Sequence, residues 1–221
     1  YKRQLLMLPF SSVDRTLTPF HEALFTATSA VCVTGLVVKD TGSYWSVAGQ
    51  TIILMLIQIG GLGVVTVAAS VSLLSGKKIS LMQRSTMQDA ISAPKVGGIV
   101  RLTRFILKGT FLIEAAGALF LLPVFLPDYG GRGIWLSVFH SISAFCNAGI
   151  DILGDSSLTA YVTNPIVNLT TMILIILSGL GFTVWFDIIA NGKKLIRREM
   201  PRRWWFTRLK LQSKLAIIMT I

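Results

Sequence analysis

The chain of 221 residues is 52% hydrophobic and only 14% charged, whereas soluble domains carry about 25% charged residues, so an ordinary soluble domain is excluded. The net charge of +11 would suit nucleic acid, but sixteen of the 21 basic residues fall in two stretches, Gly76–Lys108 and Asn191–Lys214. This clustering follows the positive-inside rule, so we expect a multi-pass protein of the inner (plasma) membrane, with both basic loops cytoplasmic and no nucleic-acid partner.

The first element after the N-terminal segment is a short apolar helix, predicted over Pro19–Ala30. Thr18 is a candidate N-cap, and Pro19 suits the first helical position. A helix of about 12 residues is about 18 Å long, which is too short for a bilayer core of about 30 Å. We therefore expect a re-entrant segment, which enters the membrane, turns at Cys32–Gly35 and returns as extended chain over Leu36–Thr41.

Three apolar runs are long enough to cross a bilayer as helices. They are Val47–Leu74, Phe105–Phe125 and Ile166–Ile189. Glycines recur inside two of these runs, and we expect them to let neighbouring helices pack closely rather than to act as hinges. They are Gly60, Gly61, Gly63, Gly179 and Gly181.

Two carboxylates lie in or near the apolar runs, where a charge is a candidate for function. Asp187 is close to a basic loop, so a structural ion pair is expected for it. Glu114 lies deeper and has no evident partner in the sequence, so its role stays open.

A second short helix is predicted over Ile134–Phe145, with an extended return over Ile150–Asp155. Leu24–Leu36 aligns with Val138–Ile150, and the aligned residues share a Ser-Ala-x-Cys-x-x-Gly pattern. The pattern predicts a parallel repeat of short helix, turn and long helix. We expect a first repeat at 1–75, a second with a cytoplasmic linker at 76–190, and a basic loop with the start of a third repeat at 191–221.

The two turns are candidates for an ion-selecting site. Non-helical backbone is tolerated at membrane depth where it lines a water-filled cavity. The C-terminal end of a short helix is partly negative and favours a cation, and extended residues can turn their carbonyls toward an ion. For a single turn the alternative is that glycine simply ends a short helix.

Four motifs in this order resemble the Trk/Ktr/HKT superfamily of potassium transporters, and most closely its bacterial KtrB (TrkH-type) membrane subunits. They are Ala30–Gly42, Leu56–Gly63, Ser143–Gly149 and Ser178–Thr183. The resemblance implies an all-α membrane protein built from helix–pore helix–helix repeats with re-entrant filter loops, like a potassium channel. It also implies four repeats in the complete protein, of which this chain holds about two.

The resemblance implies a function and a site. The protein would be the pore-forming subunit of a potassium uptake transporter or channel, with K⁺ as the permeating ion, no cofactor and no enzyme activity. The filter residues would be Val33, Thr34, Gly35, Asn147, Ala148 and Gly149, flanked by Cys32 and Cys146. The implied partners are a second copy in a homodimer and a cytosolic nucleotide-binding RCK regulatory subunit like KtrA or TrkA, in addition to membrane lipid.

Two alternatives stay open. One is a sodium or mixed monovalent cation transporter of the same architecture. The other is a membrane scaffold or lipid-processing protein, which would need converging catalytic groups that the sequence does not show. Coupling to Na⁺ or H⁺, the gating ligand and the oligomeric state are not fixed by the sequence.

Overall fold

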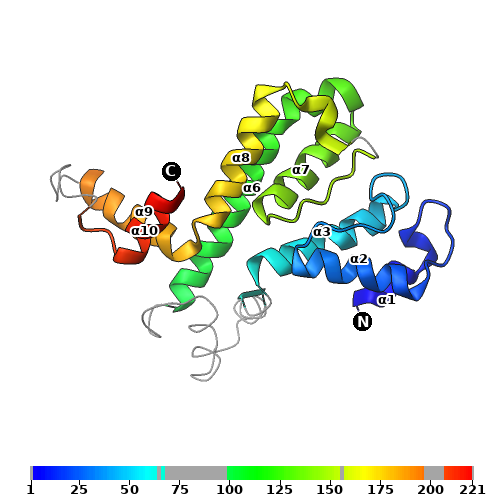
Figure 1. Cartoon of the computed structure of the whole chain (residues 1–221), viewed down its shortest axis with the longest axis horizontal. Helices are drawn as coiled ribbons and strands as arrows, with labels where there is room; N and C mark the ends of the chain where they lie inside the picture. Colours follow the sequence, from blue (N-terminus) through cyan, green and yellow to red (C-terminus); the bar gives the residue numbers. More distant parts are fainter. Residues whose placement is uncertain (1, 64–65, 68–98, 155–156, 197–206, 221) are drawn as a thin grey trace. The chain divides into compact units, whose positions relative to one another are not determined.

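The structure, a computed structural model, describes residues 2–63, 66–67, 99–154, 157–196 and 207–220 (Figure 1). These parts are helical, and their one β pairing is an isolated bridge between Ser12 and Trp45. The prediction of an all-α fold is confirmed for this part of the chain. Most of the linker expected within 76–190, the end of the run Val47–Leu74, and residues 197–206 of the second basic loop lie outside the described residues.

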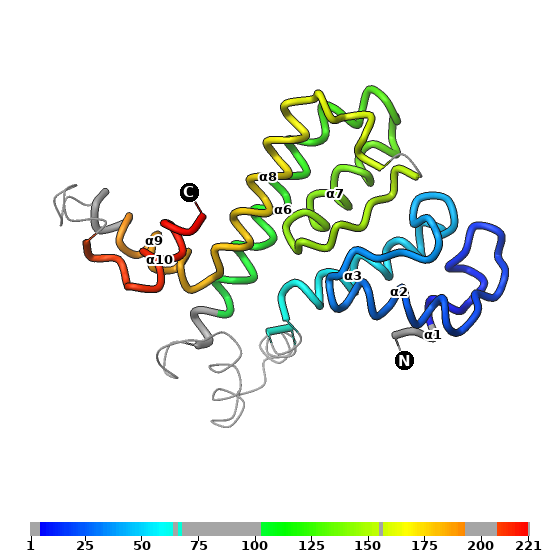
Figure 2. The backbone as a smooth tube through the Cα atoms, viewed as in Figure 1, coloured from blue at the N-terminus to red at the C-terminus, as the bar shows by residue number. Residues whose placement is uncertain are grey.

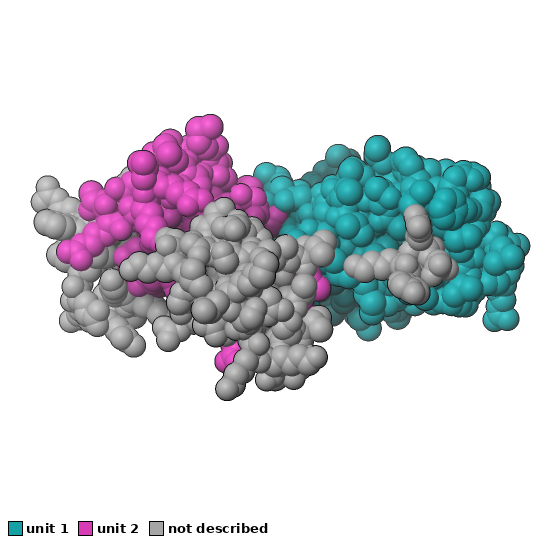
Figure 3. Space-filling model, turned by 90° about the horizontal axis from the view of Figure 1, so that it is seen from below, with its two compact units in different colours: residues 1–64, 111–175 teal, residues 65–110, 176–221 magenta. Residues whose placement is uncertain are grey.

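The chain forms two compact units, coloured separately in Figure 3. The first comprises residues 1–64 and 111–175, and the second comprises residues 65–110 and 176–221. The repeat boundaries expected at 75 and 190 stay a prediction.

The first half of the first unit contains the first short helix and the helix that follows it. Its elements are α1 (Lys2–Met7), the 3₁₀ helix η1 (Pro9–Ser11), α2 (Phe20–Cys32) and α3 (Val47–Leu62). Helices α2 and α3 lie side by side (Figure 2). The expected cap of α2 was wrong, because Pro19 is the N-cap without a side-chain hydrogen bond, and Thr18 Oγ1 lies 3.2 Å from the Tyr44 hydroxyl.

The second half of the first unit repeats this order of a short helix, a turn and a longer helix. Its elements are α6 (Ile99–Tyr129), which begins in the second unit, α7 (Arg132–Phe145), the 3₁₀ helix η3 (Ser157–Tyr161) and α8 (Pro165–Gly179), which ends in the second unit. A Cβ on Gly117 of α6 would meet Ser141 of α7 and Leu174 of α8. This glycine therefore allows close packing of the three helices.

Among the described residues, one helix is long and apolar enough to cross a membrane, Thr103–Tyr129. It contains the predicted run Phe105–Phe125. A second span is counted if the pair Pro165–Gly179 and Phe182–Gly192 forms one broken span.

In the other two predicted long helices, an α-helix ends at or just before a glycine. Helix α3 ends at Leu62, and Gly63 has a φ of +80°. Helix α8 ends at Gly179, and Gly181 has a φ of +83° before α9 (Phe182–Ile196) begins. The prediction of one continuous helix over Ile166–Ile189 was wrong, because a left-handed glycine ends an α-helix.

Close packing at Gly60 and Gly61 is confirmed. A Cβ on Gly60 would lie against the Val31 carbonyl of α2, and one on Gly61 would lie 2.5 Å from Cys146 Sγ. In contrast, no atom of the described residues lies within 4 Å of a Cβ on Gly179. Gly60 and Gly61 of the first glycine motif therefore allow close packing, whereas Gly179 of the second has no such contact among the described residues.

In the second unit, α9 packs against α10 (Leu211–Thr220) through the carboxylate of Asp187. Asp187 Oδ2 accepts hydrogen bonds from Lys210 N (2.8 Å) and Ser213 Oγ (2.7 Å), and Oδ1 accepts one from Asn191 Nδ2 (3.0 Å). A carboxylate at the start of a helix satisfies free N–H groups and the positive end of the helix dipole. In the described part of the chain, Asp187 thus has hydrogen bonds where an ion pair was expected.

Candidate functional site

The two turns share positive φ values at two aligned pairs of residues. Helix α2 ends at Cys32, and Val33 and Gly35 follow with φ values of 56° and 75°. Helix α7 ends at Phe145, and the equivalent Asn147 and Gly149 have φ values of 57° and 66°. Positive φ at non-glycine residues is uncommon. Its occurrence at the aligned Val33 and Asn147 therefore shows that the chain turns in a similar way after both short helices.

One hydrogen bond closes each turn in the same way. Ser29 Oγ donates to the Leu36 carbonyl over 2.6 Å, and Ser143 Oγ donates to the Ile150 carbonyl, also over 2.6 Å. Each serine on a short helix thereby fixes the first residue of the chain that returns from the turn. The sequence did not reveal this role, although an identical serine in both aligned segments was its signal.

Between the end of α2 and Leu36 lie Val33–Gly35, and between the end of α7 and Ile150 lie Cys146–Gly149, so each short helix is followed by a short loop. Within the loops, Thr34 N donates to Ser29 O (3.0 Å), and Ala148 N donates to Ser143 O (2.8 Å). The last carbonyls of α2 and α7 lie at these loops, so the negative ends of both helix dipoles do as well. Both loops therefore have an electrostatic preference for a cation.

The two loops meet at their glycines. A Cβ built on Gly35 would lie 2.8 Å from the Ala148 carbonyl oxygen and 3.7 Å from Gly149 Cα. A Cβ on Gly149 would lie 3.9 Å from Gly35 Cα. The structure thus brings together the predicted filter residues of both turns, which are more than 100 positions apart in the sequence. Thr34, Asn147 and Gly149 are exposed, whereas Ala148 is buried.

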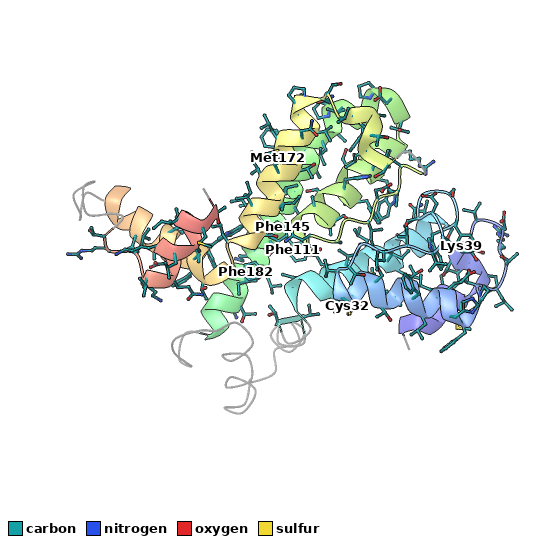
Figure 4. The ribbon with its side chains drawn as sticks, in the orientation of Figure 1. Cys32, Lys39, Phe111, Phe145, Met172 and Phe182 are labelled. Carbon is teal, nitrogen blue, oxygen red and sulfur yellow. The ribbon has the colours of Figure 1, made fainter. Side chains whose placement is uncertain are left out.

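The two cysteines differ, although they occupy aligned positions. Cys32 is exposed at the end of α2 (Figure 4), and Cys146 is only 8% exposed. Both are free thiols. Among the described residues no group of three or more His, Cys, Asp or Glu side chains could hold a metal ion. Each cysteine immediately precedes the predicted filter residues in the sequence, but only Cys146 is packed into the protein.

Gln50 ties the chain that returns from the first turn to the second short helix. Its Nε2 donates to the carbonyls of Thr41 (3.3 Å) and Trp45 (3.0 Å), and its Oε1 accepts from Trp135 Nε1 of α7 (2.8 Å). The side chain is only 3% exposed. Gln50 was missed in the sequence, where a single polar residue near the start of an apolar helix was its only signal.

A cavity of about 230 Å³ lies beside the second turn. Residues of α6, α7 and α8 line it together with Asn147, Gly149 and Asp151. His140 also lines it, with Nδ1 hydrogen-bonded to Leu136 O within α7 (2.8 Å). The second turn is therefore packed on α3 and the first turn but borders open space toward α8.

Removing the serine hydroxyls is expected to affect the two turns unequally. Ser143→Ala leaves the buried Ile150 carbonyl without its donor, so we expect the free energy of unfolding to fall by about 1–3 kcal/mol. At the first turn Leu36 is 60% exposed, so water can replace the hydroxyl in Ser29→Ala and the loss should be smaller. Thermal unfolding of both variants in detergent measures the difference, and equal losses would contradict the unequal burial.

Comparison with known proteins finds relatives that are all named for cation transport or uptake. The family TrkH, described as a cation transport protein, matches residues 5–216. The potassium/sodium uptake protein NtpJ of Enterococcus hirae is 46% identical over 217 residues, covering 98% of this chain and 45% of the relative. The Ktr system potassium uptake protein B of Bacillus subtilis is 46% identical over 190 residues (86% and 42%). Its namesake from Vibrio alginolyticus is 39% identical over 191 residues (86% and 41%). The chain spans less than half the length of these curated relatives.

Proposed function

The chain belongs to the TrkH family of cation transport proteins, and from that premise we propose that it forms part of the pore of a potassium uptake transporter or channel in a cell membrane. The observation that carries the proposal is the meeting of two equivalent loops at Gly35 and Gly149. Two loops of one geometry around a common point suit a pore with repeated units. The complete protein would supply the remaining units of a pseudo-fourfold filter.

Selection in this proposal is performed by the backbone. The carbonyls of the two loops would replace the hydration shell of the cation. The C-terminal ends of α2 and α7 would favour its positive charge. The loop residues are Val33, Thr34 and Gly35 in the first turn and Asn147, Ala148 and Gly149 in the second. Cys32 and Cys146 would flank the filter without binding the ion.

A sodium or mixed monovalent cation is the second candidate for the transported ion. It is favoured by NtpJ, whose name assigns it to both potassium and sodium uptake. The Ktr relatives are named for potassium alone. Because these names differ in the ion, the ratio of potassium to sodium uptake has to be measured.

The partners and the orientation in the membrane belong to the same proposal. Relatives named as parts of a Ktr system support a transporter that works with other subunits. We expect a homodimer that binds a cytosolic RCK regulatory subunit like KtrA or TrkA on the face of the two basic loops. Those loops would be cytoplasmic and in contact with anionic lipid, and the filter loops would face the outside.

Uptake by the complete protein tests the proposal. Cells that lack their own potassium uptake systems should grow at low potassium when they express it, and should accumulate rubidium as a tracer. Competition by excess sodium then separates the two candidate ions. A protein that reaches the membrane but supports uptake of neither ion would refute the proposed function.

A further inference from the structure

A buried carboxyl group lies near the second turn and is not used by the proposed selection of ions. Glu114 lies in α6 and is 4% exposed. Its Oε1 accepts a hydrogen bond from Gln58 Nε2 of α3 over 2.8 Å. Its Oε2 has no hydrogen-bond partner, and no ion pair of Glu114 is present among the described residues. Burying a carboxyl group with one free oxygen is unfavourable, so its presence needs a specific reason.

The contacts of Gln58 lead from this carboxyl group to the second turn. Cys146 Sγ lies 3.9 Å from Gln58 Oε1, at the limit for a thiol donor. The thiol also packs on Gly61 of α3. A glutamine amide has one acceptor end and one donor end. Since Glu114 accepts from the NH₂ group, the carbonyl end of Gln58 must face Cys146.

The same carboxyl-bearing residue is tied to α7 through its backbone. Ser141 Oγ donates to the Glu114 carbonyl over 2.7 Å, and Ser141 is completely buried. Gln58 belongs to the helix that follows the first turn, whereas Glu114 belongs to the helix that precedes the second short helix. Glu114 thus joins the two halves of the first unit immediately beside Cys146.

We infer that Glu114 is a positioning residue for ion selection: through Gln58 it fixes Cys146 and thereby the adjacent filter loop Asn147–Gly149. The inference rests on the proposed function. Cys146 immediately precedes Asn147, so a shift of the thiol moves the first carbonyl of the loop. The equivalent Cys32 is exposed and has no such link among the described contacts. The two loops are therefore supported differently, and selectivity should depend on the second.

Substitution at both ends of the link tests this role in the complete transporter. Glu114→Ala and Gln58→Leu should each lower the ratio of potassium to sodium uptake by about tenfold, the scale of one buried hydrogen bond. Glu114→Gln keeps an acceptor for Gln58 without the charge, so it should retain the wild-type ratio. If the ratio of potassium to sodium uptake fell as far in Glu114→Gln as in Glu114→Ala, the charge itself would act on the ion. That result would overturn the positioning role.

Double-mutant cycles separate this role from general stability. The effects of Gln58→Leu and Cys146→Ala on the ratio should be non-additive, whereas those of Gln58→Leu and Cys32→Ala should add. The uptake ratios are compared at equal abundance of the variants in the membrane. If Glu114→Ala does not accumulate, the double-mutant cycle of Gln58 and Cys146 tests the positioning role. If the wild type takes up potassium but the ratio is unchanged in Gln58→Leu, the inference fails alone. If the wild type takes up no cation, the proposed function fails with it.

Discussion

Replacing Gly35 with valine is expected to lower potassium uptake by about a hundredfold while the protein still reaches the membrane. The added Cβ would lie 2.8 Å from the Ala148 carbonyl oxygen, and the φ of 75° is strained for a β-branched residue. The first loop must change its conformation or the two loops must separate. Strain of about 1–3 kcal/mol in addition to the clash corresponds to a loss of about a hundredfold. Initial rates of rubidium uptake at equal membrane abundance measure it.

The control for this substitution is Gly131, a glycine at which a side chain would have room. A Cβ on Gly131 has no atom of the described residues within 4 Å, and its φ is −58°. Gly131→Ala should therefore leave uptake unchanged. Gly149→Val tests the second loop, where the positive φ of 66° acts and the nearest atom, Gly35 Cα, is 3.9 Å away. Unchanged uptake in a well-expressed Gly149→Val variant would contradict the proposal that the second loop lines the pore.

The short helices and their turns could be predicted from the sequence because their signals are local. The expected helix Pro19–Ala30 is observed as Phe20–Cys32, and Ile134–Phe145 is observed as Arg132–Phe145. The length of each apolar run and the glycine after it determined these limits. The contact between the two loops could be expected only from the family resemblance, since no local pattern joins Gly35 to Gly149.

The breaks in the long helices could not be predicted, because glycine occurs both inside membrane helices and at their ends. The sequence does not show the sign of φ at Gly63 or Gly181. Long-range partners were also hidden. Glu114 pairs with Gln58, which is 56 positions away. In the described part of the chain, Asp187 binds the backbone of Lys210 rather than a basic side chain. Such contacts depend on how the helices pack, which a single sequence does not reveal.

Replacing Gly60 with valine is expected to prevent accumulation of folded protein. Valine has a higher helix propensity than glycine, by a few tenths of a kcal/mol, so local preference predicts a slight gain in stability. Packing opposes it, because the Cβ would overlap the Val31 carbonyl, a backbone group that cannot rotate away. Helices α2 and α3, which pack side by side, would have to separate. Overpacking typically costs about 1–3 kcal/mol, which outweighs the gain in propensity.

The same substitution at Gly192 isolates the packing effect. Gly192 lies within α9, and no atom of the described residues is within 4 Å of its Cβ position. Gly192→Val should therefore be neutral or slightly stabilising, since only the helix propensity changes. Thermal unfolding in detergent, together with the amount of monodisperse protein recovered, compares the two variants. Equal stability of Gly60→Val and Gly192→Val would mean that α2 and α3 do not rely on this close contact. A loss confined to Gly60→Val would show that the approach of α3 to the end of α2, where the first filter loop begins, requires a residue without a side chain.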